Sequence, residues 1–280
     1  MRVEKRDRLA EQILPLLRCV RCKNGSLKLE PERILCSECS QAFPIYRGVP
    51  LMTLEPDAAL AYSKDVVVEN GYSEQWLDLI RKAGAGHVLD LGSGNNPSEF
   101  PNVVKMDVFA LPNVDVVGRA EELPFVDCVF KTVFSGAVFE HLRDPFGAIG
   151  EVFRVLKARG EVYIETAFLQ PVHAFPEHYF NMTLRGVERL CERFERLDSG
   201  VREHQAPSFT LRWILQSWLG KLPDAEREAF LRTTVSEILD EYGRNAFSKR
   251  WMTEFTRTDY EELAAGVYFH GYKPEKREAG

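Results

Sequence analysis

The sequence predicts an α/β protein, with a small cysteine-rich module in front of the sheet and a helical insertion near the C-terminus. Beyond Gly86, short apolar runs typical of strands alternate with segments that carry apolar residues at helical spacing. Four cysteines cluster in residues 19–39, and residues 205–260 hold several aromatic residues on expected helices. We therefore predict a module over residues 1–52 and a larger domain over residues 53–280, whose helical accessory region covers 205–260.

Length and composition indicate an ordinary globular protein. The 280 residues suffice for one large domain and a small module, and 45% of them are hydrophobic and 28% charged. No apolar run approaches the roughly 20 residues that a membrane helix needs. The apolar stretch at 13–17 is too short for a signal peptide. We therefore expect a cytoplasmic protein without a membrane-spanning segment, in a compartment that keeps thiols reduced.

The charge is unevenly distributed along the chain. The net charge is −6, yet residues 1–50 hold ten Lys and Arg against six Asp and Glu, a formal charge of +4. Four thiolates around one Zn²⁺ would lower this excess to about +2. So weak a positive charge does not favour nucleic acid as the partner, because nucleic-acid-binding proteins normally present a clearly basic face.

The cysteine cluster has the spacing of a metal site. It consists of two C-x-x-C pairs separated by thirteen residues, namely Cys19, Cys22, Cys36 and Cys39. Each pair can form a tight turn that directs two sulfurs at one ion, and four thiolates complete a tetrahedral shell around a structural Zn²⁺. Disulfides, or unligated cysteines at this spacing, are the alternatives. The isolated Cys128 and Cys191 are expected in the core, because free cysteine is among the most buried residue types.

The segments around these cysteines resemble a known module. They are Cys19-Val-Arg-Cys22, Leu35-Cys-Ser-Glu-Cys39 and Phe43-Pro-Ile-Tyr-Arg-Gly-Val-Pro50. Together they resemble the zinc ribbon of small activator subunits of tRNA and protein methyltransferases. A similar ribbon precedes the catalytic domain of bacterial rRNA guanine methyltransferases and of many other methyltransferases.

The larger domain is predicted as an alternation of helices and strands. A helix is expected over residues 74–82, with Ser73 as its N-cap and Gly84 just past its end. A second helix, with apolar residues at 146, 149, 153 and 156, should end at Gly160. The expected strands are 87–91, 103–107, 114–117, 129–135, 161–166 and 264–272, and further helices are expected around 187–194 and over 207–243.

The first of these strands runs into a glycine turn, Val88-Leu-Asp-Leu-Gly-Ser-Gly94. Gly92 and Gly94 let the backbone turn sharply and approach a ligand, and Asp90 can face an ammonium group. A dinucleotide site needs a glycine where this chain has Pro97, and a helix N-terminus for the pyrophosphate. Only eight residues, 95–102, lie between Gly94 and the next strand, which leaves little room for that helix. A ligand without phosphates, such as S-adenosylmethionine, fits better.

The order of motifs from residue 86 to 166 resembles the class I S-adenosylmethionine-dependent methyltransferases, in particular their type 11 group. The resemblance implies a Rossmann-like sheet with helices on both faces, and S-adenosylmethionine as the cofactor. It implies that the methionine part of the cofactor is surrounded by Asp90, Gly92, Ser93 and Gly94, and that Ser135 lies near the sulfonium. It also implies that Asp107 holds the ribose and that Val108 packs on the adenine, with Ala120 and Glu121 beside the adenine edge. Two positions depart from the family: Asn96 replaces a frequent third glycine, and Phe130-Lys131 replaces a common Phe-Asp.

An acceptor-binding loop is expected after the fifth strand, because loops beyond the carboxyl ends of strands line the ligand site in open α/β sheets. The segment His173-Ala-Phe-Pro-Glu-His178-Tyr179-Phe180-Asn181 occupies this position. His173 and His178 are the candidate catalytic residues, as bases for the acceptor proton. Either histidine could instead cap a backbone carbonyl.

The sequence thus predicts an enzyme, an S-adenosylmethionine-dependent methyltransferase with a structural zinc ribbon. The expected acceptor is a small or carbohydrate-like metabolite. One alternative is an RNA methyltransferase that uses the ribbon to dock RNA, and a protein acceptor is also open. The non-enzymatic alternative is a partner-binding scaffold, for which Lys131 is the only support in the sequence.

Overall fold

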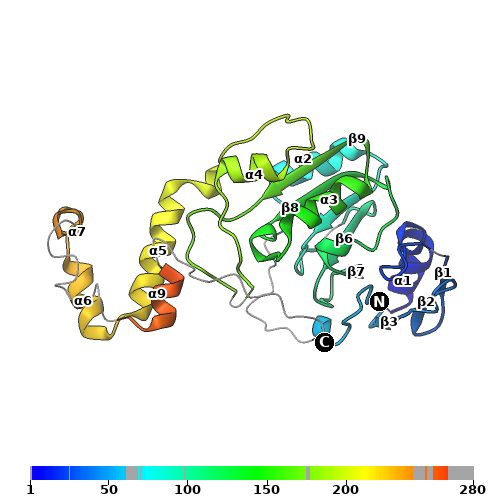
Figure 1. Cartoon of the computed structure of the whole chain (residues 1–280), viewed down its shortest axis with the longest axis horizontal. Coiled ribbons are helices and arrows are strands. Elements are labelled where there is room, and N and C mark those ends of the chain that lie inside the picture. Colours follow the sequence, from blue (N-terminus) through cyan, green and yellow to red (C-terminus); the bar gives the residue numbers. More distant parts are fainter. Residues whose placement is uncertain are drawn as a thin grey trace, which may run out of the picture. The chain divides into compact units, whose positions relative to one another are not determined.

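The computed structural model describes residues 2–24, 26–60, 69, 71–97, 99–174, 177–241, 250 and 255–263 (Figure 1). The chain divides into two compact units, Met1–Phe168 with Pro176–Gly200 and Leu169–Phe175 with Val201–Gly280. The first unit holds the cysteine cluster and the glycine turn, and the second holds the C-terminal helices. The strand predicted at 264–272 lies outside the described residues.

A five-stranded parallel sheet forms the centre of the first unit (Figure 1). Its order is β7-β6-β5-β8-β9, so the chain starts at the middle strand, runs outward to β7 and then returns to the other side of β5. In such a sheet the strand order reverses at the carboxyl end of the middle strand, which is where ligands bind. The strands are β5 (Val88–Leu91), β6 (Val103–Asp107), β7 (Val116–Val117), β8 (Phe130–Gly136) and β9 (Leu156–Glu165).

Helices cover both faces of this sheet, as predicted. Successive side chains of a strand point to opposite faces. Helix α2 (Glu74–Ala83) packs with one set of strand positions, Val88, Val103 and Phe134. Helix α3 (Pro145–Val155) packs with the alternate set, Leu89, Val104 and Val133. The predicted cap of α2 is confirmed, because Ser73 Oγ accepts a hydrogen bond from the Trp76 N–H at 3.4 Å.

The predicted end of the second helix is wrong. Helix α3 ends at Val155 rather than at Gly160, and Leu156 already has extended backbone angles. Leu156 pairs with Phe130 at the start of the β8–β9 ladder, so strand pairing ends the helix before the glycine does. The buried stripe is also shifted: Phe146 and Phe153 are 59% and 40% exposed, whereas the buried positions of the helix are Pro145, Ala148, Ile149, Val152 and Val155.

The isolated cysteines differ from each other. Cys128 is exposed and has φ +53°, so the prediction of a core position is wrong for it. It lies in the turn before β8, where its N–H reaches the Arg154 carbonyl at 3.0 Å. Cys191 is half-buried just after helix α4 (Leu184–Leu190), and burial raises the pKa of its thiol to about 11.

The N-terminal module is a four-stranded antiparallel sheet with the order β1-β2-β3-β4, preceded by helix α1 (Arg2–Arg8). Arg47 and Gly48 both have positive φ, +50° and +85°, in the two-residue turn that joins β3 to β4. Two positive φ angles in succession are typical of the tightest hairpins, and glycine at the second position favours this turn. The strands are β1 (Leu27–Leu29), β2 (Arg33–Cys36), β3 (Ala42–Tyr46) and β4 (Val49–Pro50).

Both ends of this module are hydrogen-bonded to residues 117–126, which run from β7 of the larger sheet into the connection toward β8. On one side the Arg18 N–H donates to the Pro124 carbonyl at 2.8 Å, and the Val126 N–H donates to the Leu16 carbonyl at 2.9 Å. On the other side the Met52 N–H donates to the Val117 carbonyl at 2.8 Å.

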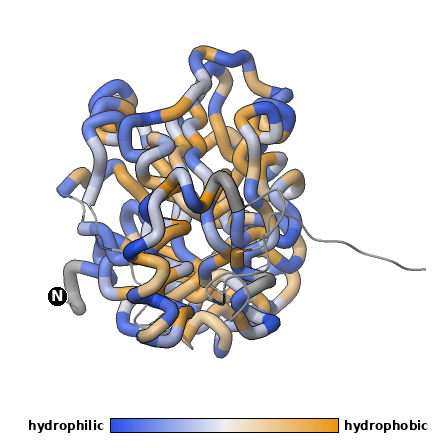
Figure 2. Tube along the Cα trace, turned by 90° about the vertical axis from the view of Figure 1, so that its left-hand side faces the viewer, coloured by the Kyte–Doolittle hydropathy of each residue, from blue (hydrophilic) through white to orange (hydrophobic). Residues whose placement is uncertain are grey.

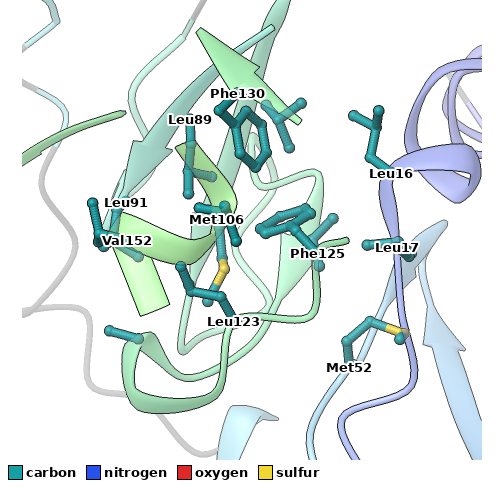
Figure 3. Close-up of a cluster of buried hydrophobic side chains, with 14 of the residues drawn as sticks. Leu16, Leu17, Met52, Leu89, Leu91, Met106, Leu123, Phe125, Phe130 and Val152 are labelled. Atoms are coloured by element: carbon teal, nitrogen blue, oxygen red, sulfur yellow. The ribbon is translucent and has the colours of Figure 1, made fainter. Parts of the chain in front are cut away.

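Apolar packing reinforces these bonds. Figure 3 shows Leu16, Leu17 and Met52 in the same buried cluster as Phe125 and Leu123. All five side chains are buried in one cluster, which also includes Cys19 and Cys36. The cysteine cluster and the sheet therefore share one hydrophobic core. The domain boundary at residue 52 stays a prediction.

The part of the second unit that follows residue 203 is mainly helical where it is described. Trp218 stacks on Phe230 with ring centroids 6.0 Å apart, and Leu222 is buried beside them. Lys221 binds the carboxylates of Asp259 and Glu262 at 3.2 and 2.6 Å. The helices are α5 (Pro207–Lys221), α6 (Asp224–Arg232), α7 (Val235–Glu241) and α9 (Arg257–Leu263).

Hydropathy alternates along the whole chain, and the apolar stretches of Figure 2 are separated by polar loops and turns. This short-range alternation is the pattern of amphipathic elements around a core. Within the described part of the chain, no helix is both long enough and apolar enough to cross a membrane.

Candidate cofactor site and cysteine cluster

The glycine turn at the end of β5 is closely packed. Gly92 has φ +77° and Gly94 has φ +55°, and the N–H groups of Gly92 and Ser93 both donate to the Met106 carbonyl at 2.8 and 3.0 Å. A Cβ atom on Gly92 would lie 2.1 Å from a methyl group of Val138, in the loop that follows β8. Only glycine permits both this backbone conformation and this contact. The turn after β5 and the loop after β8 are therefore in direct contact.

Asp107 lies at the carboxyl end of β6, beside this turn. Its carboxylate accepts hydrogen bonds from the Gly94 N–H at 2.9 Å and from the Phe109 N–H at 3.0 Å. Burial raises the pKa of Asp107, and the two N–H donors oppose this effect. Because the carboxylate is held by main-chain donors on both sides, its orientation is fixed before any ligand arrives.

Asp90 is 1% exposed and forms a hydrogen bond with Tyr72, whose hydroxyl donates to Oδ2 at 2.8 Å. Burial raises the pKa of Asp90 to about 7, the Tyr72 hydrogen bond and Lys105 oppose the rise, and the charge of Asp107 adds to it. Sequence reasoning missed Tyr72. The nearby cap at Ser73 marks the start of a helix and gives no sign that the preceding hydroxyl reaches a strand.

An aromatic cluster surrounds this pair. Trp76 stacks on Phe134 with ring centroids 4.9 Å apart, and Tyr72 meets Phe134 edge to face at 5.6 Å. The Trp76 Nε1–H is buried and has no hydrogen-bond partner among the residues that the structure describes. A Cβ atom on Gly136 would lie 2.6 Å from the Trp76 ring, so glycine at the end of β8 leaves room for the indole.

The departure at Asn96 has a structural reason. Asn96 is 5% exposed and its Oδ1 accepts a hydrogen bond from the Gly71 N–H at 3.0 Å. Its side chain therefore joins the glycine turn to the segment before α2. No helix occurs in the described residues between β5 and β6, which are 92–97 and 99–102. The helix N-terminus that binds a pyrophosphate is thus missing from this described stretch.

The remaining predicted cofactor residues differ in how they are presented. Val108 is 44% exposed, whereas Ala120 is 3% exposed at the start of a short turn. Glu121 forms an ion pair with Arg119 at 3.7 Å. Ser135 is fully buried, and its hydroxyl donates to the Leu91 carbonyl at 2.8 Å, so it joins β8 to the end of β5.

The structure places the candidate histidines in different units. His178 lies in the first unit beside His141, with ring centroids 5.4 Å apart and its Nε2 at 2.9 Å from Asn181 Oδ1. His173 belongs to the second unit, where its ring centroid is 5.2 Å from that of Trp213. The segment of His178 is anchored, because the N–H groups of Tyr179 and Phe180 donate to the Glu140 carbonyl at 2.7 and 3.1 Å.

The second departure, Lys131, lies away from these residues. It is near the amino-terminal end of β8, and its Nζ donates to the Arg159 carbonyl at 3.3 Å. A Cβ atom on Gly86 would lie 2.8 Å from the Lys131 side chain. Ligands of parallel sheets bind at the carboxyl ends of the strands. Lys131 lies at the amino-terminal end of its strand and is therefore far from the glycine turn.

The four clustered cysteines converge on one point. Their sulfur atoms all lie within 4.8 Å of one another, with Cys19 Sγ 3.6 Å from Cys39 Sγ and Cys22 Sγ 3.7 Å from Cys36 Sγ. A tetrahedron of sulfurs about 2.3 Å from a zinc ion has edges of about 3.8 Å. Burial acts to raise the pKa of Cys36, yet the N–H groups of Cys39 and Glu38 outweigh it and hold this pKa at about 7. The donor set fits a tetrahedral metal ion.

Replacement of Gly92 by alanine is expected to lower the free energy of unfolding by more than about 1–2 kcal/mol, the cost of a left-handed conformation alone, because Val138 must also move. The matched control is Gly150→Ala, since no atom lies within 4 Å of that position in α3. The control should be neutral or stabilising by up to about 1 kcal/mol. Urea unfolding measures both, and equal effects of the two substitutions would contradict the packing of the turn.

Asp90 predicts a pH dependence of stability. Its pKa is about 7 in the folded protein, raised by burial, and about 4 in the unfolded chain. Between these pH values the folded state holds the extra proton, so stability falls as pH rises from about 4 to about 7, by on the order of 4 kcal/mol, and then levels off. Asp90→Asn should lack this slope in urea unfolding. Parallel pH profiles of wild type and variant would refute the assignment.

Comparison with known proteins gives one family match, over residues 89–164, to the family described as a methyltransferase domain. A tRNA U34 carboxymethyltransferase of Campylobacter curvus is 31% identical over 98 residues, which are 30% of this chain and 33% of that protein. The chain therefore matches only about a third of the length of this relative.

Two solved structures are similar to parts of the chain. The YcgJ protein of Bacillus subtilis is 20% identical, over 60% of this chain and 88% of that one, with a TM-score of 0.37. The phosphoethanolamine N-methyltransferase 2 of Haemonchus contortus, in complex with phosphomonomethylethanolamine and S-adenosylhomocysteine, is 18% identical, over 63% and 49%, with a TM-score of 0.39. The likeness to methyltransferases therefore rests on the family match and on the strand order of the sheet. By these two findings residues 89–164 match a methyltransferase domain and lie on a Rossmann-like parallel sheet.

Proposed function

We propose that this protein transfers a methyl group from S-adenosylmethionine to a small or carbohydrate-like acceptor. The observation that carries the proposal is the hydrogen bond between the Gly94 N–H and Asp107 Oδ2 at 2.9 Å. It joins a main-chain turn, which a ligand can approach closely, to a carboxylate that can hold the two hydroxyls of a ribose.

The proposed cofactor site follows the carboxyl ends of β5, β6 and β8. The backbone of Gly92, Ser93 and Gly94 would border the methionine part, with Asp90 toward its ammonium group. Asp107 would hold the ribose. Val108 would pack on the adenine, Ala120 and Glu121 would lie beside the adenine edge, and Ser135 would lie near the sulfonium. This arrangement is supported by the position of the two carboxylates, because Asp90 is fully buried and Asp107 is half-buried, and a carboxylate shielded from water interacts strongly with an incoming cation or hydroxyl.

The cofactor would supply an already activated methyl group. The residues of the protein would then orient the acceptor in line with the methyl carbon and accept the proton that the acceptor loses. His178 is proposed as this base, because its segment is anchored to the Glu140 carbonyl in the loop that touches Gly92 through Val138. His173 stays a second candidate.

An RNA acceptor is the alternative, favoured by the similarity of part of the chain to a protein named as a tRNA carboxymethyltransferase. A protein acceptor also remains open. A screen with methyl-labelled cofactor against metabolite, RNA and protein fractions separates these acceptors. The scaffold alternative has lost its support, because Lys131 lies at the end of the sheet opposite to the proposed cofactor site, where it binds the Arg159 carbonyl.

We propose a structural Zn²⁺ at Cys19, Cys22, Cys36 and Cys39. Support comes from the fit of the sulfur positions to a tetrahedron and from the position of two of these cysteines in the shared hydrophobic core. All four positions would be filled by protein sulfur, so the ion would support folding rather than catalysis. Reduced thiols are needed for such a site, which is consistent with a cytoplasmic location.

Replacement of Asp107 by alanine is expected to weaken S-adenosylmethionine binding by about 1–3 kcal/mol, because a buried hydrogen bond to the ribose is lost. Isothermal titration calorimetry measures this change, and thermal denaturation checks that the variant is folded. Asp78→Ala on the exposed side of α2 is the control, and it should leave the affinity unchanged. Wild-type protein that fails to bind the cofactor at millimolar concentration would contradict the proposed function itself.

Purified protein should retain one equivalent of zinc through dialysis, as measured by elemental analysis. Cys36→Ser should lose the metal and lower the unfolding temperature of the whole first unit in one transition, since the cysteine cluster and the sheet share a core. Cys128→Ser, at an exposed position, is the matched control and should keep both zinc and stability. Metal-free protein with an unchanged unfolding temperature would exclude a structural zinc ion.

A further inference from the structure

The loop after β8 carries a cluster of polar side chains that the proposed cofactor does not use. The Glu140 side chain is 1% exposed and accepts a hydrogen bond from the Thr166 hydroxyl at 2.8 Å, while its carbonyl binds the N–H groups of Tyr179 and Phe180. Two segments that are distant in the sequence are therefore held side by side. Arg143 lies on the first segment, and Glu177 and Tyr179 lie on the second.

These three side chains form a closed triangle. The Arg143 Nε–H donates to the Tyr179 hydroxyl at 2.8 Å, and Nη2 donates to Glu177 Oε1 at 3.3 Å. The Tyr179 hydroxyl donates to Glu177 Oε2 at 2.5 Å, and the guanidinium carbon is 5.7 Å from the centre of the Tyr179 ring. Both oxygens of one carboxylate are thus bound by a guanidinium and a phenol.

The electrostatic surroundings favour an anion at this position. The Tyr179 hydrogen bond lowers the pKa of Glu177, and the charges of Arg143 and Arg119 lower it further. Arg119 directly precedes Ala120 and also pairs with Glu121 at 3.7 Å. The carboxylate of Glu177 therefore lies in the positive field of two arginines from two different loops.

Folding does not explain this arrangement well. The side chains of Arg143 and Glu177 are 69% and 51% exposed, and exposed ion pairs contribute little to stability. For the same reason the bound carboxylate can be exchanged at small cost. A planar carboxylate from a ligand would find the same donors, in the geometry that guanidinium groups prefer.

The cluster also lies on the acceptor side of the proposed site. It belongs to the loop whose Val138 touches Gly92, and His178 of the proposed base lies between Glu177 and Tyr179 in the sequence. We propose that Arg143 and Tyr179 form a subsite for a carboxylate group of the methyl acceptor, and that the side chain of Glu177 occupies it when no acceptor is bound. The assignment of this carboxylate to the acceptor rests on the proposed methyltransferase function.

The experiment uses acetate as the probe and the full-length protein saturated with S-adenosylhomocysteine. Chemical shifts of the arginine Nε–H groups, in protein labelled with ¹⁵N at arginine, report binding at Arg143, and line broadening of the acetate methyl signal reports binding in the variants that lack this arginine. Glu177→Gln removes the internal competitor, and it is expected to tighten acetate binding by roughly twofold to fivefold, the range that an exposed ion pair allows. Arg143→Gln in the Glu177→Gln background should abolish the binding.

Two comparisons distinguish specific binding of a carboxylate from nonspecific attraction of any anion. Acetamide should not bind, and inorganic phosphate should gain less than acetate from Glu177→Gln. Arg143→Lys should restore only part of the affinity, since lysine keeps the charge but loses the two parallel donors. Arg185→Gln is the matched control, because Arg185 is also exposed and paired with a glutamate, Glu188, at 2.6 Å.

Unchanged acetate affinity in Glu177→Gln, or an equal gain for phosphate, would overturn the proposal. Tyr179→Phe gives an independent check, because it removes only the hydroxyl and should weaken acetate binding in the Glu177→Gln background. The assay also distinguishes the two levels of inference. Failure of S-adenosylhomocysteine to bind would contradict the methyltransferase function, whereas bound S-adenosylhomocysteine without an acetate response would contradict the subsite alone.

Discussion

A single series of main-chain hydrogen bonds connects the cysteine module to the glycine turn. The Met52 N–H binds the Val117 carbonyl, and the next residue, Gly118, donates its N–H to the Asp107 carbonyl at 3.0 Å. The Asp107 side chain then receives the Gly94 N–H. Each step uses a backbone group, so the register of the module and the conformation of the turn are set together. Preorganisation of this kind avoids ordering costs when a ligand binds.

The same region concentrates charge in a poorly hydrated environment. The charge of Asp107 adds to the burial that raises the pKa of Asp90, and Lys105 is 8% exposed nearby with its own pKa lowered by burial. A cation bound beside these carboxylates would stabilise their ionised forms. The proposed cofactor would bring an ammonium group to one carboxylate and hydroxyl donors to the other. Stability and binding are thus coupled through the same two side chains.

Much of the fold could be predicted from local patterns, because strands β5, β6 and β8 are short segments rich in apolar residues and α2 has a capped amphipathic pattern. The errors came where distant pairing decides the outcome. Leu156 keeps the helical spacing, yet its pairing with Phe130 makes it a strand residue. Free cysteine is usually buried, yet Cys128 lies in a turn with positive φ and is exposed.

The candidate residues of the site, which stay predictions, could be named from the sequence mainly where they belong to a short motif. The glycine turn and the cysteine pairs are short segments with fixed spacing, so their residues could be named in advance. Tyr72 and Arg143 could not, because each reaches a partner across the fold: Asp90 lies eighteen residues from the tyrosine, and Tyr179 lies 36 residues from the arginine. No periodicity in the sequence records such a pairing.

The position of the N-terminal module has a further consequence for the sheet. β7 is one outer strand of the parallel sheet, and Leu51 bridges to Val117 on it. An outer strand with free N–H and carbonyl groups is a template for pairing with another chain, and proteins commonly shield it. Here the shield is the end of the module, so a fragment that began after residue 52 would uncover this strand. The cysteine module thus also shields this strand from pairing with another chain.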